Sequence, residues 1–244
     1  MMLPFLSSDL KSKDGTVSKF RTLSCGISLL FFSSLAFADG LTLGGTRLIY
    51  DATKKEASIS LDNRGKSAPQ LVQAWVSDKN RGRNNIPFVV TPPVAKLAQD
   101  STTSVRVVYT GQSLPADRET QFLLNVRAVP ATEKQDNPQR VTIATQNIIK
   151  LIYRPAGLTA DGASRAGESL KVTRVGNGVR FDNPTPYVIS LTSVVINGKK
   201  IERPGTVQPL DNLTVPFNDG TPSSVSWRTI NDFGGMTKEI QVRF

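Results

Sequence analysis

The sequence predicts an all-β protein that contains two β-sandwich domains. Short segments rich in β-branched and aromatic residues recur along the chain, and turn-forming residues separate them. No segment keeps the period of a helix for more than a turn or two. After Arg154-Pro155-Ala156-Gly157 the strand pattern starts again, and the length suits two small domains joined near Pro155.

Turn signals bound the predicted strands of both domains. Thr91-Pro92-Pro93 and Leu114-Pro115-Ala116-Asp117, for example, interrupt the first group. The predicted strands of the first domain are residues 42–50, 57–61, 71–76, 104–109 and 122–129. Those of the second domain are residues 169–175, 179–182, 187–195, 213–217, 224–230 and 238–243.

A further predicted strand, residues 139–155, is unusually long. Its sequence, QRVTIATQNIIKLIYRP, has small or apolar residues at alternate positions, a lysine deep inside and a proline at the end. A strand of about 13 residues is well beyond the usual 5 or 6. Proteins normally blunt or cover a long exposed strand because it can pair with another chain. We therefore interpret this strand as a candidate pairing surface.

The N-terminal segment has the pattern of a secretory signal peptide. Basic residues precede an apolar run at residues 23–35, which ends at Ala36-Phe37-Ala38 before Asp39. This order is typical of exported proteins, and the run is too short to span a membrane. We expect export and cleavage after Ala38.

The exported chain is expected to fold without a disulfide. Cys25 is the only cysteine, and it would leave with the signal peptide. No later stretch is apolar enough for insertion into a membrane. The predicted organisation is a signal peptide at residues 1–38, a first domain at 39–155 and a second domain at 156–244.

The chain is basic, with a formal net charge of +10. Such a surface can attract nucleic acid, anionic lipid or an acidic protein. However, the basic residues are scattered, and the aromatic residues do not alternate with them in a base-stacking pattern. We predict a solvated basic surface and no nucleic-acid partner.

The composition argues against most classes of enzyme. There is no histidine, and no cysteine follows the signal peptide, which removes Ser-His-Asp and Cys-His sites and the commonest zinc ligands. No phosphate-binding glycine motif is present. Asp117 and Glu119 flank Arg118, which favours an ion pair over a catalytic pair of carboxylates. Ser-Lys chemistry is not excluded, but no motif points to it, so we predict no enzyme activity, catalytic residue, metal or cofactor.

Eight short motifs follow one another in a characteristic order across both predicted domains. Together they resemble the PapD-like family, the periplasmic chaperones of the chaperone–usher pilus pathway, over essentially the whole exported chain. The sequence departs from the family pattern at Gln121 and Leu123, neither of which is a functional position. The motifs are TRLIY at 46–50, QAW at 73–75, TPP at 91–93, LPADRE at 114–119, NVRAVP at 125–130, IKLIYRP at 149–155, NPTPY at 183–187 and INDFGG at 230–235.

The resemblance implies a fold and a function. The fold would be two immunoglobulin-like β-sandwich domains arranged in an L with a cleft between them. Such chaperones bind pilin subunits in the periplasm, cap them and deliver them to an outer-membrane usher for fimbria assembly. A pilin lacks the last strand of its own sandwich, and the long strand of the chaperone fills the open groove by donor-strand complementation. A self-capping homodimer of the free protein is an alternative to the monomer.

By position, Val141, Ile143 and Thr145 match the alternating donor-strand residues of this family. Thr145 stands where a larger aliphatic residue is common, so it would bury less apolar area. The alternative is that all three are ordinary core residues of the protein itself.

Arg47 and Lys150 match the family's anchor for the C-terminal carboxylate of the pilin. An arginine and a lysine together supply charge and hydrogen-bond donors for a carboxylate. The alternative is that both are solvated strand charges, although Lys150 lies between apolar neighbours. In a regular strand Lys150 would face away from Val141 and Ile143, so either a bulge intervenes or the lysine works from the other face.

Glu119, Arg154 and Asp232 match an inter-domain salt-bridge network of the family. An arginine between two carboxylates could fix the angle between the domains, a role in orientation and not in catalysis. The short connection at residues 132–140 and the absence of a cysteine pair indicate the subgroup that serves rod-like adhesive pili.

The competing interpretation is a secreted two-domain immunoglobulin-like adhesin or structural module. Such a protein would bind its target without donating a strand, and its binding would not depend on Arg47 or Lys150.

Overall fold

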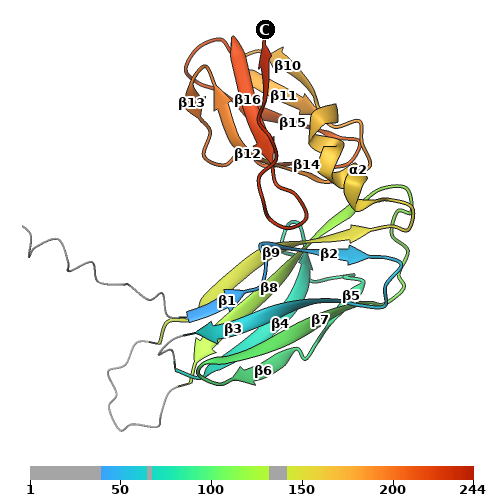
Figure 1. The fold of residues 1–244 in the computed structure, drawn as a ribbon, viewed down its shortest axis with the longest axis vertical. Helices are drawn as coiled ribbons and strands as arrows, with labels where there is room; N and C mark the ends of the chain where they lie inside the picture. Colours follow the sequence, from blue (N-terminus) through green and yellow to red (C-terminus); the bar gives the residue numbers. More distant parts are fainter. Residues whose placement is uncertain (1–39, 65–67, 132–141) are drawn as a thin grey trace, which may run out of the picture. The chain divides into compact units, whose positions relative to one another are not determined.

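The computed structural model describes residues 40–64, 68–131 and 142–244 (Figure 1). The predicted signal peptide and its cleavage site lie outside this part. The all-β prediction is confirmed, since the only helices in the described residues are the short α2 (Ala160–Arg165) and a 3₁₀ turn (Ala166–Ser169). The strands form two β-sandwich domains, each with its own hydrophobic core.

The first domain consists of two sheets packed face to face. One sheet has the strand order β1-β3-β7-β5 and the other β2-β9-β8-β4-β6. Every pairing within them is antiparallel except β2 with β9, which is parallel. The strands are β1 (Gly40–Leu43), β2 (Arg47–Asp51), β3 (Ala57–Arg64), β4 (Gln70–Asp78), β5 (Phe88–Thr91), β6 (Val94–Leu97), β7 (Ser101–Tyr109), β8 (Thr120–Pro130) and β9 (Thr145–Arg154).

Alternation along β8 shows how the first core is built. Phe122, Leu124, Val126 and Ala128 are all buried and face the opposing sheet, as expected for successive residues that point to opposite faces of a strand. Complete burial of a large apolar side chain stabilises the fold by about 1.5–3 kcal/mol. The intervening residues of β8 occupy the outer face, which Leu123 shares with its partner Lys150 on β9.

The strand predicted at residues 42–50 is in fact two strands in different sheets. β1 pairs with β3, whereas β2 pairs with β9, so the chain changes sheets at Gly44-Gly45-Thr46. A side chain on Gly44 would collide with the hydroxyl of Ser60 on β3, which explains why a glycine stands at this crossing. The continuous run of β-formers concealed this break.

Sequence reasoning also missed β5 and β6. It placed only a turn at Thr91-Pro92-Pro93, and the structure has a cis peptide between Thr91 and Pro92 with a short strand on either side. Four-residue strands are too short for alternation alone to reveal them.

The second domain has a three-stranded sheet, β10-β11-β15, and a second sheet in which β12 pairs with β13, β14 and β16, and β16 pairs with β17. Phe181 and Trp227 meet edge to face at 5.5 Å in its core. Each strand predicted here is present within a few residues of its expected bounds, whereas β13 and β14 were missed. The strands are β10 (Lys171–Val175), β11 (Gly178–Asp182), β12 (Ile189–Ile196), β13 (Lys199–Lys200), β14 (Thr206–Val207), β15 (Asn212–Pro216), β16 (Ser224–Thr229) and β17 (Ile240–Arg243).

Candidate functional site

The strand predicted at residues 139–155 is shorter than expected in the described part. β9 begins at Thr145, and residues 142–144 are not in a strand. The pairing of Ala128 with Thr145 would place Ile143 opposite Pro130, which has no backbone N–H to donate to the ladder. The prediction for residues 142–144 was therefore wrong, and Val141 lies outside the described residues.

The two halves of β9 have different neighbours. β8 pairs with residues 145–153 along one edge. Along the other edge β2 pairs only with residues 150–154, starting where Arg47 meets Lys150. Among the described residues, 145–149 have no pairing strand on this side, and such an open edge is a template for another strand.

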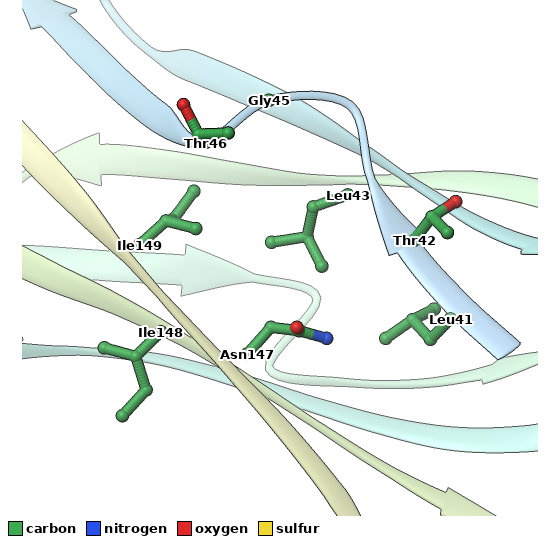
Figure 2. A pocket seen from close by; sticks show the side chains of 8 residues that line it. All are labelled: Leu41, Thr42, Leu43, Gly45, Thr46, Asn147, Ile148 and Ile149. Atoms are coloured by element: carbon green, nitrogen blue, oxygen red, sulfur yellow. The ribbon is translucent and has the colours of Figure 1, made fainter. Parts of the chain in front are cut away.

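An apolar groove of about 470 Å³ runs beside this open edge. Leu41 and Leu43 reach into it from β1 (Figure 2). Asn147 and Ile149 face it from β9, whereas Ile148 points away (Figure 2). A strand added to β9 would thus find apolar side chains on the core side of its path.

Ile143 and Thr145 are not core residues of the first domain. The side chain of Ile143 is 72% exposed, and Thr145 is also exposed. An exposed isoleucine beside a strand edge is available for contact with a partner. The alternative interpretation of these two residues as ordinary core is therefore wrong.

The orientation of Lys150 is set by an uninterrupted register. The pairing of β8 with β9 runs without a shift from Thr145 to Tyr153, so no bulge lies in this stretch. Lys150 therefore faces the side opposite Thr145 and Ile149. A bulge is therefore absent from residues 145–153, and the anchoring role of Lys150 stays a prediction.

Arg47 and Lys150 are direct neighbours in the parallel pair of β2 and β9. Arg47 is only 9% exposed, and its burial lowers its pKa, partly offset by the charges of Asp232 and Glu119. Burial, together with the nearby positive charge of Arg47, lowers the pKa of Lys150 to about 8. A buried and a half-buried cation side by side favour the binding of an anion.

Groups of the second domain hold both cations. Lys150 Nζ donates hydrogen bonds to Ser190 Oγ at 2.6 Å and to Thr206 Oγ1 at 2.7 Å. Arg47 Nη1 donates to the carbonyl of Ile230 at 3.0 Å, and its buried Nε finds no acceptor among the residues that the structure describes. In the described part of the chain, neither cation forms a salt bridge with a carboxylate. The pair therefore retains its charge and an unused donor.

Arg154, four residues after Lys150, is paired with carboxylates. Its Nε donates to Glu119 Oε1 at 2.7 Å, and its two terminal nitrogens donate to Asp232 at 2.7 and 2.9 Å. The other oxygen of Glu119 accepts the N–H of Val188 at 2.7 Å. Burial alone would lower the pKa of Arg154, but its bonds to Asp232 and Glu119 outweigh burial and raise it. The three residues named from the sequence thus form one network across residues of both domains.

Sequence reasoning missed Ser190, Thr206 and the carbonyl of Ile230. A serine and a threonine in strands carry no signal of their own, and a carbonyl is present at every residue. Only the pairing of β12 with β14, which makes Ser190 and Thr206 cross-strand neighbours, brings the two hydroxyls together.

The described residues contain no group of three or more His, Cys, Asp or Glu side chains that could hold a metal. Among their helices, none has the length and apolar character needed to cross a membrane. Asp117 and Arg118 form an exposed ion pair at 2.9 Å, whereas Glu119 turns inward to Arg154.

Two family models match the chain. Residues 40–159 match "Pili and flagellar-assembly chaperone, PapD N-terminal domain", and residues 165–241 match "Pili assembly chaperone PapD, C-terminal domain". The probable fimbrial chaperone LpfB of Escherichia coli O157:H7 is 39% identical over 226 residues, which cover 91% of this chain and 95% of LpfB. The chaperone protein FimC of Escherichia coli K12 is 33% identical over 205 residues, or 82% of this chain and 83% of FimC.

Solved structures agree with this assignment. The chain is similar to a structure of the Salmonella enterica SafA pilin in complex with the SafB chaperone, with a TM-score of 0.74, 30% identity and coverage of 86% of this chain and 98% of that one. The E. coli chaperone DraB gives a TM-score of 0.72 at 28% identity and covers 84% of this chain and 99% of its own. From its sequence, its two sandwich domains and these relatives, the chain belongs to the PapD family of pili assembly chaperones.

Proposed function

We propose that this chaperone binds a pilin subunit by strand addition along the open edge of β9. The side chains of Val141, Ile143 and Thr145 enter the groove of the subunit, and Arg47 and Lys150 bind its C-terminal carboxylate. The observation that carries the proposal is the edge at residues 145–149, which has no pairing strand among the described residues. This edge leads directly to Arg47 and Lys150, two cations without a carboxylate partner in the same part of the chain.

The chemistry of the site supports this partner. An incoming strand gains backbone hydrogen bonds from the edge and apolar contacts from Leu41, Leu43 and Ile149. A chain that ends in a carboxylate gains in addition a charge-assisted bond at Lys150 and a donor from Arg47. The similar structure of the Salmonella enterica SafA pilin in complex with the SafB chaperone supports a pilin as the partner class.

The wider setting of the proposal is a capped subunit in the periplasm. The chaperone is exported, loses residues 1–38 by cleavage after Ala38, and folds as a first domain at 39–155 and a second at 156–244. The family models that meet near residues 159–165 and the separate cores support this division. The chaperone then delivers the subunit to an outer-membrane usher.

The network of Glu119, Arg154 and Asp232 has an orienting role in this proposal. It ties the end of β9 to the loop after β16, and that loop also supplies the Ile230 carbonyl to Arg47. Fixing this loop keeps the carbonyl that accepts from Arg47 in place.

The test is co-purification from the periplasm with the subunit encoded beside the chaperone gene. We expect Arg47→Ala and Lys150→Ala to lower the recovery of subunit at least about tenfold, because a carboxylate would lose a charge-assisted partner. Lys96→Ala on the exposed edge strand β6 is the matched control and should recover as much subunit as the parent. Equal recovery with Lys150→Ala would contradict the proposal and favour an adhesin.

A further inference from the structure

Lys150 is held by hydroxyl groups, although a carboxylate would be the usual partner of a buried ammonium. Its Nζ lies 2.6 Å from Ser190 Oγ and 2.7 Å from Thr206 Oγ1. Ser190 is 1% exposed, so this hydroxyl is a built part of the interior. Buried ammonium groups are normally paired because desolvation is costly.

A single patch of the second domain organises both cations. Ser190 and Thr206 are cross-strand partners on β12 and β14, so their side chains share one face. The carbonyl of Ser190 accepts the N–H of Ile230 at 3.0 Å, and the carbonyl of Ile230 accepts Arg47 Nη1 at 3.0 Å. A chain of three hydrogen bonds thus links Lys150 to Ser190, Ser190 to Ile230, and Ile230 to Arg47.

Neutral acceptors leave the positive charge of a lysine uncompensated. A hydroxyl accepts a hydrogen bond and orients the ammonium, and the third N–H of that group is still available for a ligand. An aspartate or glutamate at the same place would form an internal ion pair and weaken the attraction for an incoming anion. Hydroxyl partners therefore suit a site whose positive charge has to remain available for the carboxylate of a ligand.

We propose that Ser190 and Thr206 are positioning residues of the anion site, which hold the ammonium of Lys150 ready for the C-terminal carboxylate of a subunit. The inference rests on the proposed function of Arg47 and Lys150. It adds that the anchor is completed by the second domain and is not a property of β2 and β9 alone.

The experiment uses two synthetic peptides with the C-terminal strand sequence of the subunit encoded beside the chaperone gene. One peptide ends in a free carboxylate and the other in an amide. Their affinities are measured for the full exported chain, for Ser190→Ala with Thr206→Val, and for Thr192→Ala, a matched control that removes a neighbouring hydroxyl from β12. The parent should bind the free acid more tightly than the amide. In the double variant the affinity for the free acid should fall about tenfold, while the affinity for the amide changes little. Thr192→Ala should behave as the parent.

A second readout separates positioning from general structure. The pKa of Lys150, followed by NMR of its side chain, should fall in the double variant because two acceptors that favour the charged form are gone. Ser190→Thr should keep both the preference and the pKa, since it keeps a hydroxyl. Thr206→Val alone, at a half-buried position, gives the same test if the double variant does not fold.

The outcomes distinguish the inference from the function on which it rests. If Lys150→Ala removes the preference for the free acid while the double variant retains it, the positioning role is wrong and the anchor stands. If Lys150→Ala itself leaves the preference unchanged, the anchor is wrong and the positioning role falls with it. Loss of the preference in both, with Thr192→Ala unaffected, supports the inference.

Discussion

Lys150 and Arg154 lie on the same face of β9 with Ile152 between them, and their polar partners are opposite in kind. Both are largely withdrawn from water and both contact residues of the second domain. Arg154 meets two carboxylates and forms a closed network with Glu119 and Asp232. Within the described ranges, the polar neighbours of Lys150 are two hydroxyls and the cation Arg47. The difference indicates that a compensated cation stabilises the fold, whereas an uncompensated one is available for a ligand.

The sharpest contrast is expected from removing each cation. Arg154→Ala would leave Glu119, which is 3% exposed, as a buried charge without its partner. Breaking a buried pair on one side typically costs about 3–5 kcal/mol. We expect the free energy of unfolding, measured by urea denaturation, to fall by this amount. A loss below about 1 kcal/mol would show that the network contributes no more than a surface ion pair.

Lys150→Met should have the opposite profile. The change replaces a desolvated ammonium with an apolar group of similar length, which is often neutral or stabilising for buried charges. We expect the free energy of unfolding to change by less than about 1.5 kcal/mol while capture of the subunit is lost. A strongly destabilised Lys150→Met variant would mean that this lysine, like Arg154, is a structural residue.

A partial break of the Arg154 network should lie between these cases. Asp232→Asn removes one negative charge and one of two parallel bonds, while Glu119 keeps its partner. The Asp232 side chain is 21% exposed, so solvent moderates the loss. We expect a destabilisation of about 1–2 kcal/mol by urea denaturation. A loss as large as that of Arg154→Ala would place the main contribution at Asp232 and not at Glu119.

The two cations should also differ in their response to pH. With a pKa of about 8, Lys150 is charged below that pH and loses its proton above it. Affinity for a free-acid peptide should fall about tenfold per unit above pH 8, and affinity for the amide should not change through this group. Titration of peptide binding from pH 6 to 10 by calorimetry measures both.

The same lowered pKa has the opposite effect on stability. Between pH 8 and 10.5 the unfolded chain holds the Lys150 proton that the folded chain has released, so this group's contribution to stability rises with pH. The difference in unfolding free energy between the parent and Lys150→Met isolates this contribution. A difference that is constant across this range would contradict the lowered pKa.

Several features of the molecule could be read from local patterns. The absence of histidine is a matter of composition. The alternation of apolar residues in β8 follows from the two-residue period of a strand. The motifs around Arg47, Lys150 and Arg154 carried the family resemblance, which the family models confirm. These are properties of short segments, so they remain visible in a linear sequence.

Other features depend on which distant segments meet. The change of sheets at Gly44, the open edge at residues 145–149 and the facing of Lys150 all follow from pairing registers. The hydroxyls at Lys150 come from residues 40 and 56 positions further along the chain. Strand pairing over such separations is decided by the packing of whole sheets and leaves no mark in the spacing of residues. The sequence alone thus determined the all-β class, the two sandwich domains and most of the longer strands, because these depend on local patterns. Only the tertiary structure decided which cation meets carboxylates and which meets hydroxyls, because these partners come from distant segments.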